Sequence, residues 1–169
     1  MKEIKLSQRN KKSKNRHLVA LVDDEDYEYL NQWNWSGEKH RNTFYAHRVD
    51  TTGEKNIKIK MHRLLAGVTD SRILVDHKDG NGLNNCKHNI RACNASQNSM
   101  NRKVYTKKKS SKYKGVHYRE KGDFWIASIG ARENRHYLGC FEFEKDAAIA
   151  YNKAAEKLYG EFANSNIIV

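Results

Sequence analysis

Residues 101–112 most restrict how this chain can fold. They read NRKVYTKKKSSK, with almost no apolar side chains and with lysine recurring along the segment. Such a segment has almost nothing to bury in a hydrophobic core, and its block of lysines is typical of an exposed linker. We interpret residues 104–112 as a basic linker, so the sequences on its two sides must fold separately. The chain of 169 residues is long enough for two small units, each with a modest core.

The net charge restricts the possible partners. The chain has 32 Lys plus Arg residues against 20 Asp plus Glu, which gives a formal net charge of +12. This excess favours a polyanionic partner, with nucleic acid first. A membrane surface is the competing polyanion, but no stretch approaches about 18 consecutive apolar residues, and the Lys-rich N-terminus lacks the apolar part of a signal peptide. We therefore expect a cytoplasmic protein with no membrane partner.

The three cysteines, Cys86, Cys93 and Cys140, are odd in number and include no CxxC pair. This spacing indicates neither a disulfide framework nor a zinc finger. We expect all three to be reduced thiols.

Residues 1–57 are predicted to form a small α+β region. The basic segment 1–16 has little to bury and is either flexible or a first strand with a charged turn. Periodicity and turn signals predict three further elements. These are a strand at 17–23 (HLVALVD), a helix at 24–32 (DEDYEYLNQ) and a hairpin at 43–61 that turns at 51–54.

The acidic run at 23–26 has two interpretations. Its carboxylates resemble a metal site, but they also stand where a helix begins, and acidic groups are favoured at the positive end of a helix. Helix capping is the commoner explanation, and we adopt it.

Residues 73–102 read ILVDHKDGNGLNNCKHNIRACNASQNSMNR. The pattern predicts a strand at 73–77, a loop rich in turn residues at 79–85, a second strand at 88–94 and a helix at 95–102. The region therefore has the order strand, loop, strand, helix.

Two adjacent residues of the first strand suit phosphodiester hydrolysis, which needs a base to activate water and a divalent cation to neutralise developing charge. His77 suits the base, because an imidazole with a pKa near ~6.5 is largely neutral at physiological pH. Asp76 points to the opposite side of an extended backbone and can reach a metal ion. Asn98 on the helix offers a second hard oxygen ligand. The competing interpretation is ordinary turn chemistry, in which the Asp76 and His77 pair is structural.

Side-chain amides are concentrated around the loop. Asn81, Asn84 and Asn85 lie in it, and Asn89 follows it. Such amides can tie loop backbone together where no sheet ladder reaches it. Asn89 is our candidate for locking the loop that carries His77.

The region also resembles a known family. MHRLL at 61–65, VDHKDGNGLNN at 75–85, NIR at 89–91 and the later Asn98 are similar to the HNH endonucleases, in the branch of homing endonucleases from mobile introns and phages. The resemblance covers residues 58–103 and implies a ββα-metal finger. It implies His77 as the general base and Asn89 as the residue that stabilises the finger. It also implies Asp76 and Asn98 as ligands of one Mg²⁺ or Mn²⁺ ion, in a bacterial or phage-infected cell.

Other residues of the resemblance are less specific. Asn98 stands where many relatives have a third-position His, although the homing branch also uses Asn there. The cysteine pairs that brace some relatives are absent from the sequence, so packing and amide hydrogen bonds must brace the finger. His62 either packs or forms a hydrogen bond under the finger, and Arg63 either contacts a DNA phosphate or pairs with an acid.

Residues 113–169 are predicted to form a three-stranded antiparallel sheet packed on one helix. The strands are expected at 113–118, 123–130 and 135–141, and the helix at 144–160. The apolar stripe of the helix comprises Ala147, Tyr151, Ala154, Ala155 and Leu158, with Gly160 placed to end it. The sheet residues expected to face the helix are Val116, Trp125, Ala127 and Leu138. The opposite face, basic and partly aromatic, comprises His117, Arg119, Ser128, Arg135 and Tyr137.

This region is similar to the plant ethylene-response-factor DNA-binding domain. YKGV, W-I-A, YLG-x-F, DAAIAYNKAA and G-x-x-A-N match over residues 112–165. The resemblance implies a sheet that reads the major groove of double-stranded DNA. The residues at DNA-contacting positions are Lys114, His117, Arg119, Arg135 and Tyr137. His117 and Tyr137 replace an Arg and a Trp, so the target sequence cannot be transferred from the plant proteins.

These patterns predict a site-directed, divalent-metal-dependent DNA endonuclease, an HNH-type phosphodiester hydrolase with no obligate protein partner. One finger per chain would nick one strand. The linker lysines Lys107, Lys108 and Lys109 either follow a phosphate backbone or form a solvated spacer. The alternative function is a non-catalytic DNA-binding transcriptional regulator. A third class, an RNA-binding protein, would stack bases on the aromatic and basic sheet face.

Overall fold

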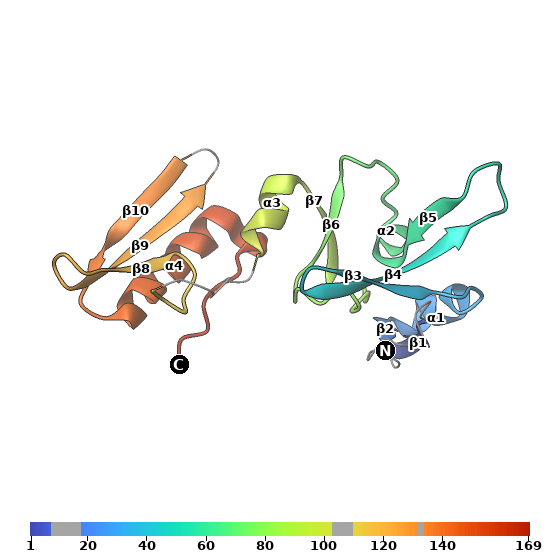
Figure 1. Ribbon diagram of the computed structural model, residues 1–169, viewed down its shortest axis with the longest axis horizontal. Helices are drawn as coiled ribbons and strands as arrows, with labels where there is room; N and C mark the ends of the chain where they lie inside the picture. Colours follow the sequence, from blue (N-terminus) through green and yellow to red (C-terminus); the bar gives the residue numbers. More distant parts are fainter. Residues whose placement is uncertain (8–17, 103–109, 132–133) are drawn as a thin grey trace. The chain divides into compact units, whose positions relative to one another are not determined.

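The computed structural model describes residues 1–7, 18–102, 110–131 and 134–169 (Figure 1), and the predicted linker lysines Lys107, Lys108 and Lys109 lie outside these ranges. The chain divides into two compact units, Met1–Ala95 and Ser96–Val169. The described ranges contain small β-sheets and four α-helices, so the fold is a mixture of both element types as predicted. None of these helices is both long and apolar enough to cross a membrane.

The first unit contains three antiparallel sheets and two short helices. One sheet pairs β1 (Lys2–Lys5) with β2 (Val19–Val22), and α1 (Asp24–Leu30) follows. The second sheet has the order β3 (Ser36–His40), β4 (Thr43–Asp50) and β5 (Ile57–Lys60), and α2 (Met61–Leu65) follows. The third sheet pairs β6 (Leu74–His77) with β7 (Ile90–Cys93).

Most elements predicted for this unit are confirmed. The strand at 17–23, the helix at 24–32 and the hairpin at 43–61 correspond to β2, α1 and the β4–β5 pair. The start of the basic segment 1–16 forms a strand, β1. The strand β3 was not predicted, because its sequence SGEKH shows no apolar alternation and the strand depends on pairing with β4.

The capping interpretation of Asp23 is wrong. Asp23 occupies the N-cap position of α1, but its side chain forms no capping hydrogen bond. The Asp23 carboxylate instead accepts a hydrogen bond of 2.7 Å from the backbone N–H of Lys87. Asp24, Glu25 and Asp26 do lie in the first turn, where carboxylates favour the positive end of the helix.

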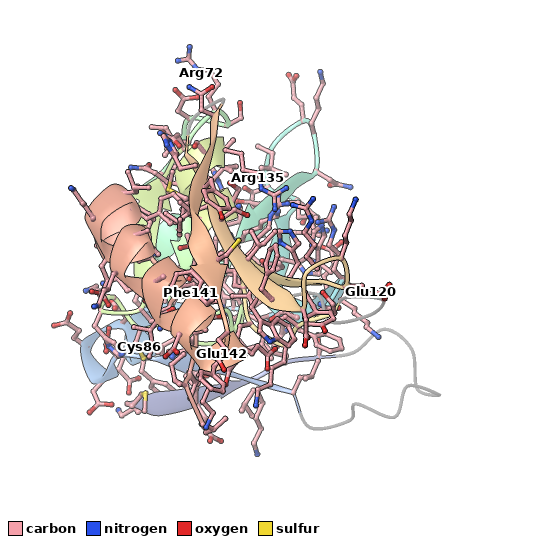
Figure 2. The ribbon with its side chains drawn as sticks, turned by 90° about the vertical axis from the view of Figure 1, so that its left-hand side faces the viewer. Arg72, Cys86, Glu120, Arg135, Phe141 and Glu142 are labelled. Atoms are coloured by element: carbon pink, nitrogen blue, oxygen red, sulfur yellow. The ribbon has the colours of Figure 1, made fainter. Side chains whose placement is uncertain are left out.

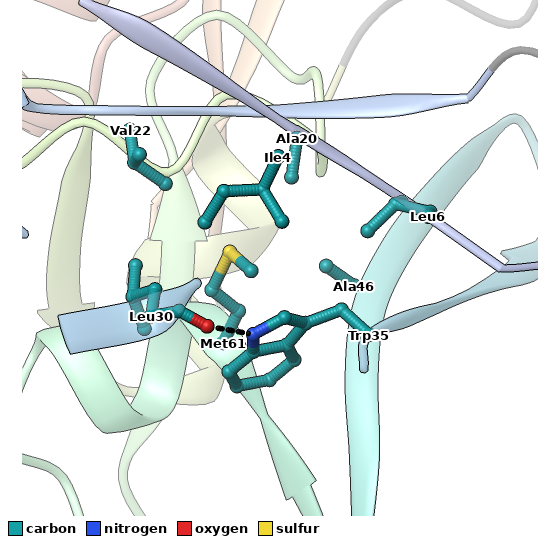
Figure 3. Close-up of a cluster of buried hydrophobic side chains, with 8 residues drawn as sticks. All are labelled: Ile4, Leu6, Ala20, Val22, Leu30, Trp35, Ala46 and Met61. Carbon is teal, nitrogen blue, oxygen red and sulfur yellow. Dashed lines mark hydrogen bonds between the residues drawn. The ribbon is translucent and has the colours of Figure 1, made fainter. Parts of the chain in front are cut away.

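The core of the first unit gathers side chains from the chain between β1 and α2 (Figure 3). The buried residues are Ile4, Leu6, Ala20, Val22, Leu30, Trp35, Ala46 and Met61. Trp35 is completely buried, and its indole N–H donates a hydrogen bond of 2.8 Å to the Leu30 carbonyl at the end of α1. Full burial of one such large side chain contributes on the order of 2–3 kcal/mol. The bond to Leu30 also satisfies the polar atom that this burial would otherwise leave unpaired.

The second unit takes in most of the short helix α3 (Ala95–Met100) and contains a three-stranded antiparallel sheet. The sheet has the order β10 (Asn134–Phe141), β9 (Phe124–Ala131) and β8 (Val116–Arg119). The helix α4 (Glu144–Tyr159) packs on this sheet, and the 3₁₀ turn η1 (Gly160–Phe162) follows. This is the predicted arrangement of three strands and one helix.

The α4 stripe is mostly as predicted. Ala147, Tyr151 and Ala155 are buried, and Gly160 ends the helix with a positive φ of 53°. Leu158 is a correction, because 44% of this residue is exposed. It lies in the last turn of α4, beyond the last buried residue of the helix. Ala148, which was not predicted, is fully buried instead.

The pairing register fixes which residues share a face of the sheet. Tyr137 pairs with Ser128 and Arg135 with Gly130, so all four lie on one face. The other face carries the residues that pack against α4, namely Val116, Trp125, Ala127 and Leu138. The two faces predicted from alternation are therefore confirmed. A register shift between Tyr137 and Gly139 interrupts the alternation in β10.

Gly115 offers a test of the packing between β8 and α4. Its φ is +76°, and an added Cβ would lie 2.0 Å from the Tyr151 ring. We expect Gly115→Ala to destabilise the second unit by at least about 2 kcal/mol, because it adds both a clash and backbone strain. Gly130→Ala is the control, because nothing lies within 4 Å of its added Cβ. Hydrogen exchange of the β9 amides in both variants measures the effect, and equal protection would contradict the close approach.

Candidate active site and nucleic-acid interface

Strand β6 carries Asp76 and His77, and antiparallel pairing sets them opposite Arg91 and Ile90 of β7. The Arg91 guanidinium donates two hydrogen bonds to Oδ2 of Asp76, 3.1 Å from Nε and 2.9 Å from Nη2. Both side chains are buried, with 9% of the Arg91 side chain and 8% of the Asp76 side chain exposed. A buried carboxylate held by one guanidinium is fixed in direction, and removal of either partner would leave an uncompensated charge.

His77 is buried among rings from other elements. Its ring centroid lies 5.7 Å from that of Tyr45 on β4 and 5.1 Å from that of His62 on α2. Its Nε2 atom lies 3.4 Å from the side-chain oxygen of Asn85. Burial lowers the pKa of His77 below its ordinary value of 6.5. The imidazole is therefore neutral at physiological pH and can accept a proton.

His62 lies under His77, as one of its two predicted interpretations required. It is buried, and its ring packs on those of His77 and Tyr45. Burial, with a smaller contribution from the neighbouring His77, lowers the pKa of His62 to about 3. Its Nδ1 atom has no hydrogen-bond partner among the described residues. The pair of histidines is thus a neutral, ring-packed layer rather than a charged one.

The loop between β6 and β7 is closed by a hydrogen-bond network around Asp79. The Asp79 carboxylate accepts hydrogen bonds from the Asn81 backbone at 2.8 Å, the Asn84 amide at 2.7 Å and the Asn89 amide at 3.1 Å. Partial burial alone would raise the pKa of Asp79, but these hydrogen bonds outweigh it and hold the pKa below 3.8. Asn89 also donates to the Asn84 carbonyl and accepts from the Asp79 backbone. It therefore joins three points of the loop.

Gly82 allows this loop to approach β4 closely. A Cβ at Gly82 would lie 2.5 Å from both the Phe44 carbonyl oxygen and the Tyr45 ring. The Gly82 backbone N–H also donates a hydrogen bond of 2.8 Å to the Thr43 hydroxyl. Only glycine fits here, and the contact positions the Tyr45 ring that packs on His77.

Asn98 and Arg63 complete the predicted residues of this region. Asn98 lies on α3 in the second unit, whereas Asp76 lies in the first, so a shared metal site stays a prediction. Arg63 donates hydrogen bonds to the carbonyls of Ile73 at 2.7 Å and Asp70 at 2.8 Å. These bonds fasten α2 to the chain before β6, a structural role that was not predicted. The phosphate contact of Arg63 stays a prediction.

The outer face of the second unit's sheet carries four residues predicted to contact DNA, and all four are exposed. They are His117, Arg119, Arg135 and Tyr137. Arg135 is labelled in Figure 2, and its Nε donates a hydrogen bond of 3.0 Å to the Ser128 hydroxyl. Of the Tyr137 residue, 64% is exposed. The face thus presents cations and an aromatic ring to solvent, with Arg135 directed by a neighbouring strand.

Lys114 has a different environment from the other residues predicted to contact DNA. Its ammonium donates a hydrogen bond of 2.5 Å to the Met100 carbonyl at the end of α3. Burial lowers the pKa of Lys114 to about 8. Both residues also line a groove of about 520 Å³, together with Ser96, Ser99, Gly115, Ser128, Gly130, Asn134, Arg135, Tyr151 and Tyr159. This groove is polar and carries two cationic side chains.

Several site residues were not predicted. Arg91 lies inside the quoted NIR motif, and the hairpin register alone would have set it opposite Asp76. The Asp79 carboxylate accepts a hydrogen bond from the backbone N–H two positions later, at Asn81. This pattern is common in turns and could have been predicted from the sequence. Tyr45 comes from a hairpin about 30 residues upstream, and no local sequence signal connects it with His77.

Comparisons with known proteins agree with both parts of the chain. No family model matches. This chain is 37% identical over 116 residues to an uncharacterized HNH endonuclease of Acanthamoeba polyphaga mimivirus. The aligned residues make up 66% of this chain and 59% of the mimivirus protein. Over 60 residues, 34% of this chain, it is 45% identical to Dehydration-responsive element-binding protein 2D of Arabidopsis thaliana, of which it covers 29%.

A third relative is covered more completely. The chain is 30% identical over 89 residues to Protein 3.8 of Escherichia phage T7. The aligned residues make up 53% of this chain and 72% of Protein 3.8. The chain belongs to the same family as Protein 3.8. It spans little more than half of the mimivirus protein and less than a third of the plant protein, so their activities do not transfer to it directly.

The buried histidines make the stability of the first unit depend on pH. Unfolded His62 takes up a proton near pH 6.5, whereas folded His62 stays neutral down to about pH 3. Protons therefore favour the unfolded state in this window, and the free energy of unfolding falls as pH falls through it. We expect His62→Phe, which keeps a ring, to reduce the slope by up to about 1.4 kcal/mol per pH unit between pH 6 and 4. Urea denaturation at several pH values measures the slope, and identical slopes would contradict the burial of a neutral imidazole.

Proposed function

We propose that the protein is a divalent-metal-dependent DNA endonuclease of the HNH homing type that nicks one strand. The carrying observation is the adjacent pair on β6, in which His77 is held neutral in a packed ring layer while Asp76 is fixed by Arg91. The similarity to a protein named as an HNH endonuclease supports this function. The ββα-metal finger would comprise β6, β7 and α3.

His77 acts as the general base in the proposed reaction. The Asn85 side-chain oxygen near Nε2 favours the tautomer in which Nε2 carries the proton. The neutral ring accepts a proton from water as the water oxygen attacks the phosphorus atom. Since burial keeps the imidazole neutral, the base is ready at physiological pH.

The donor chemistry of the proposed metal ligands fits a hard divalent cation. Asp76 offers a buried carboxylate, whose attraction for a cation is stronger than that of an exposed one, and Asn98 offers an amide oxygen. These residues would hold one Mg²⁺ or Mn²⁺ ion. When bound, the ion neutralises charge on the phosphate and assists the leaving oxygen. Arg91 orients the Asp76 carboxylate toward this role.

Asn89 stabilises the finger in this proposal. Its amide joins the Asp79 backbone, the Asp79 carboxylate and the Asn84 carbonyl. The network holds the short loop that connects His77 to β7. A base held by a closed loop keeps its distance to the reacting phosphate, which is the main requirement for proton transfer in the transition state.

The second unit supplies the affinity for double-stranded DNA. A three-stranded sheet with exposed cations on one face can enter a major groove. The proposed contacts come from His117, Arg119, Arg135 and Tyr137, and Lys114 and Arg135 also line the polar groove beside α3. The similarity of this region to a plant protein named for binding a DNA element supports the assignment.

The Asp76–Arg91 ion pair also favours a second candidate function. The guanidinium already neutralises the carboxylate, so Asp76 is stable without a cation. A DNA-binding regulator could use the finger only as a docking element. Such a protein would bind DNA with an affinity that is independent of Mg²⁺, and it would cut none.

A nicking assay on supercoiled DNA tests the catalytic assignment. We expect His77→Ala to lower the rate at least about 100-fold, because it removes the general base, while DNA binding is retained. Asp76→Asn should also abolish cutting, and it is preferred to alanine because it preserves shape opposite Arg91. Asp70→Asn, at an exposed Asp–Arg pair, is the matched control and should cut normally. Undiminished cutting by His77→Ala would exclude this base, and binding without cutting by the wild type under Mg²⁺ or Mn²⁺ would favour the regulator.

The sheet face is tested by the salt dependence of binding. If Arg135 contacts a DNA phosphate, Arg135→Ala should weaken binding and lower the slope of log affinity against log salt by about 0.9. Arg72→Ala is the control, because the Arg72 side chain is 88% exposed in the first unit and pairs with Asp70. Filter binding of duplex DNA at four or five salt concentrations measures both slopes. An unchanged slope for Arg135→Ala would remove this residue from the phosphate contacts.

A further inference from the structure

Three side chains of different chemistry converge where α1 begins. Asp23 immediately precedes α1, and Cys86 and His88 lie in the segment before β7. One carboxylate oxygen, the thiol sulfur and one imidazole nitrogen all lie within 4.8 Å of one another. Cys86, labelled in Figure 2, is fully buried, whereas His88 is exposed. The cluster therefore has a buried floor and an open side.

Backbone hydrogen bonds hold this convergence in place. The Lys87 N–H donates to the Asp23 carboxylate at 2.7 Å, so the residue between Cys86 and His88 is tied to the third member of the cluster. The neighbouring backbone is tied to β2, because Leu21 donates to the Leu83 carbonyl and accepts from the Asn85 N–H, both at 2.8 Å. The fold thus brings the three side chains together, and the Cys86 thiol and the Asp23 carboxylate also form a side-chain hydrogen bond.

We propose that Asp23, Cys86 and His88 bind one borderline-soft divalent transition-metal ion of the zinc type, with water as the fourth ligand. Thiolate, imidazole and carboxylate are the zinc ligands of proteins, whereas Mg²⁺ avoids sulfur. On binding, the Cys86 S–H bond breaks, the proton passes to solvent and a metal–sulfur bond forms, without any change in oxidation state. This site is distinct in residues and in metal chemistry from the proposed nuclease centre, and it does not depend on it.

The distances require only a small adjustment. A tetrahedral zinc ion with bonds of about 2.0–2.3 Å separates its ligand atoms by about 3.3–3.8 Å. The three atoms therefore need to approach by at most about 1.5 Å, which the exposed His88 side chain can supply by rotation. Two nearby carboxylates are already paired with a cation, because Lys87 lies 2.6 Å from Glu25 and 3.1 Å from Asp26.

A metal ion here would brace the segment that supports the finger. Cys86 directly follows Asn85, whose side chain lies against His77, and His88 directly precedes Asn89, which closes the Asp79 loop. The ion would link both positions to the start of α1 and so to the core of the first unit. The ion would brace the finger, as the cysteine pairs that are absent from this sequence do in some relatives. Ion binding is expected to stabilise the folded first unit by an amount that rises with the logarithm of the ratio of ion concentration to Kd.

Cobalt titration of the full chain tests the proposal, because thiolate ligation gives Co²⁺ an intense near-ultraviolet charge-transfer absorption that oxygen ligands do not give. We expect this absorption to saturate at a single Co²⁺ per chain in the wild type and to be absent in Cys86→Ser. His88→Ala, at an exposed position that tolerates substitution, should bind Co²⁺ at least tenfold more weakly. Zn²⁺ should raise the Tm of the wild type and have a smaller effect on His88→Ala.

Two control variants separate this site from other thiols. Cys93→Ser changes a buried thiol on β7, and Cys140→Ser changes an exposed one on β10, and both should keep the absorption. Absence of the absorption from the wild type at millimolar Co²⁺ would overturn the proposal. Its persistence in Cys86→Ser, or an affinity in His88→Ala equal to that of the wild type, would overturn it as well.

Discussion

The attachment of residues 83–85 to the free edge of β2 is the interaction on which the candidate site depends. Both backbone groups of Leu21 are used, since its N–H donates to Leu83 and its carbonyl accepts from Asn85. The adjacent residues of β2, Ala20 and Val22, are fully buried in the core. A loop rich in Gly and Asn has little apolar surface of its own, so it gains its order from this edge. The position of His77 is thus fixed through Asn85 by the core of the first unit.

The candidate site buries polar side chains, and this burial lowers the free energy of unfolding of the first unit. The neutral His62 and His77 rings and the Asp76–Arg91 pair occupy volume that apolar side chains could fill more favourably. The His62 Nδ1 atom is buried without a hydrogen-bond partner in the described part of the chain. Polar groups that are buried at a cost in stability break the usual rules of protein cores. Such groups are commonly found at functional sites.

The parts of the fold that could be predicted from sequence are those with a local signal. The β9 strand is rich in aromatic and β-branched residues and begins after turn residues, α4 has an apolar stripe ended by Gly160, and the finger loop has turn residues at fixed offsets. The strand β3 has no such signal, because its sequence SGEKH lacks apolar alternation and the strand forms by pairing with β4. Burial of Leu158 was wrongly predicted, because periodicity gives the direction of a side chain and not the length of the partner surface.

The candidate site divides in the same way between local and distant residues. Asp76, His77 and Asn89 stand in one short motif, so the sequence could place them close together. Tyr45 and His62 reach His77 from β4 and α2, and such long-range packing leaves no periodic trace in a single sequence. The environment that lowers the pKa of His77 could therefore not be predicted, although the residue itself could.

The electrostatics of the two units imply a division of labour in the proposed function. The pair on β6 offers DNA a neutral imidazole and a carboxylate already paired with Arg91, so by itself it attracts a phosphate backbone weakly. The second unit carries exposed cations on a sheet face, which favour binding to a polyanion. Binding through the second unit would hold the first at a high effective concentration near the same duplex. The proposed proton transfer needs a buried, neutral base, whereas affinity for DNA needs exposed cations. In the proposed function, each unit meets one of these two requirements.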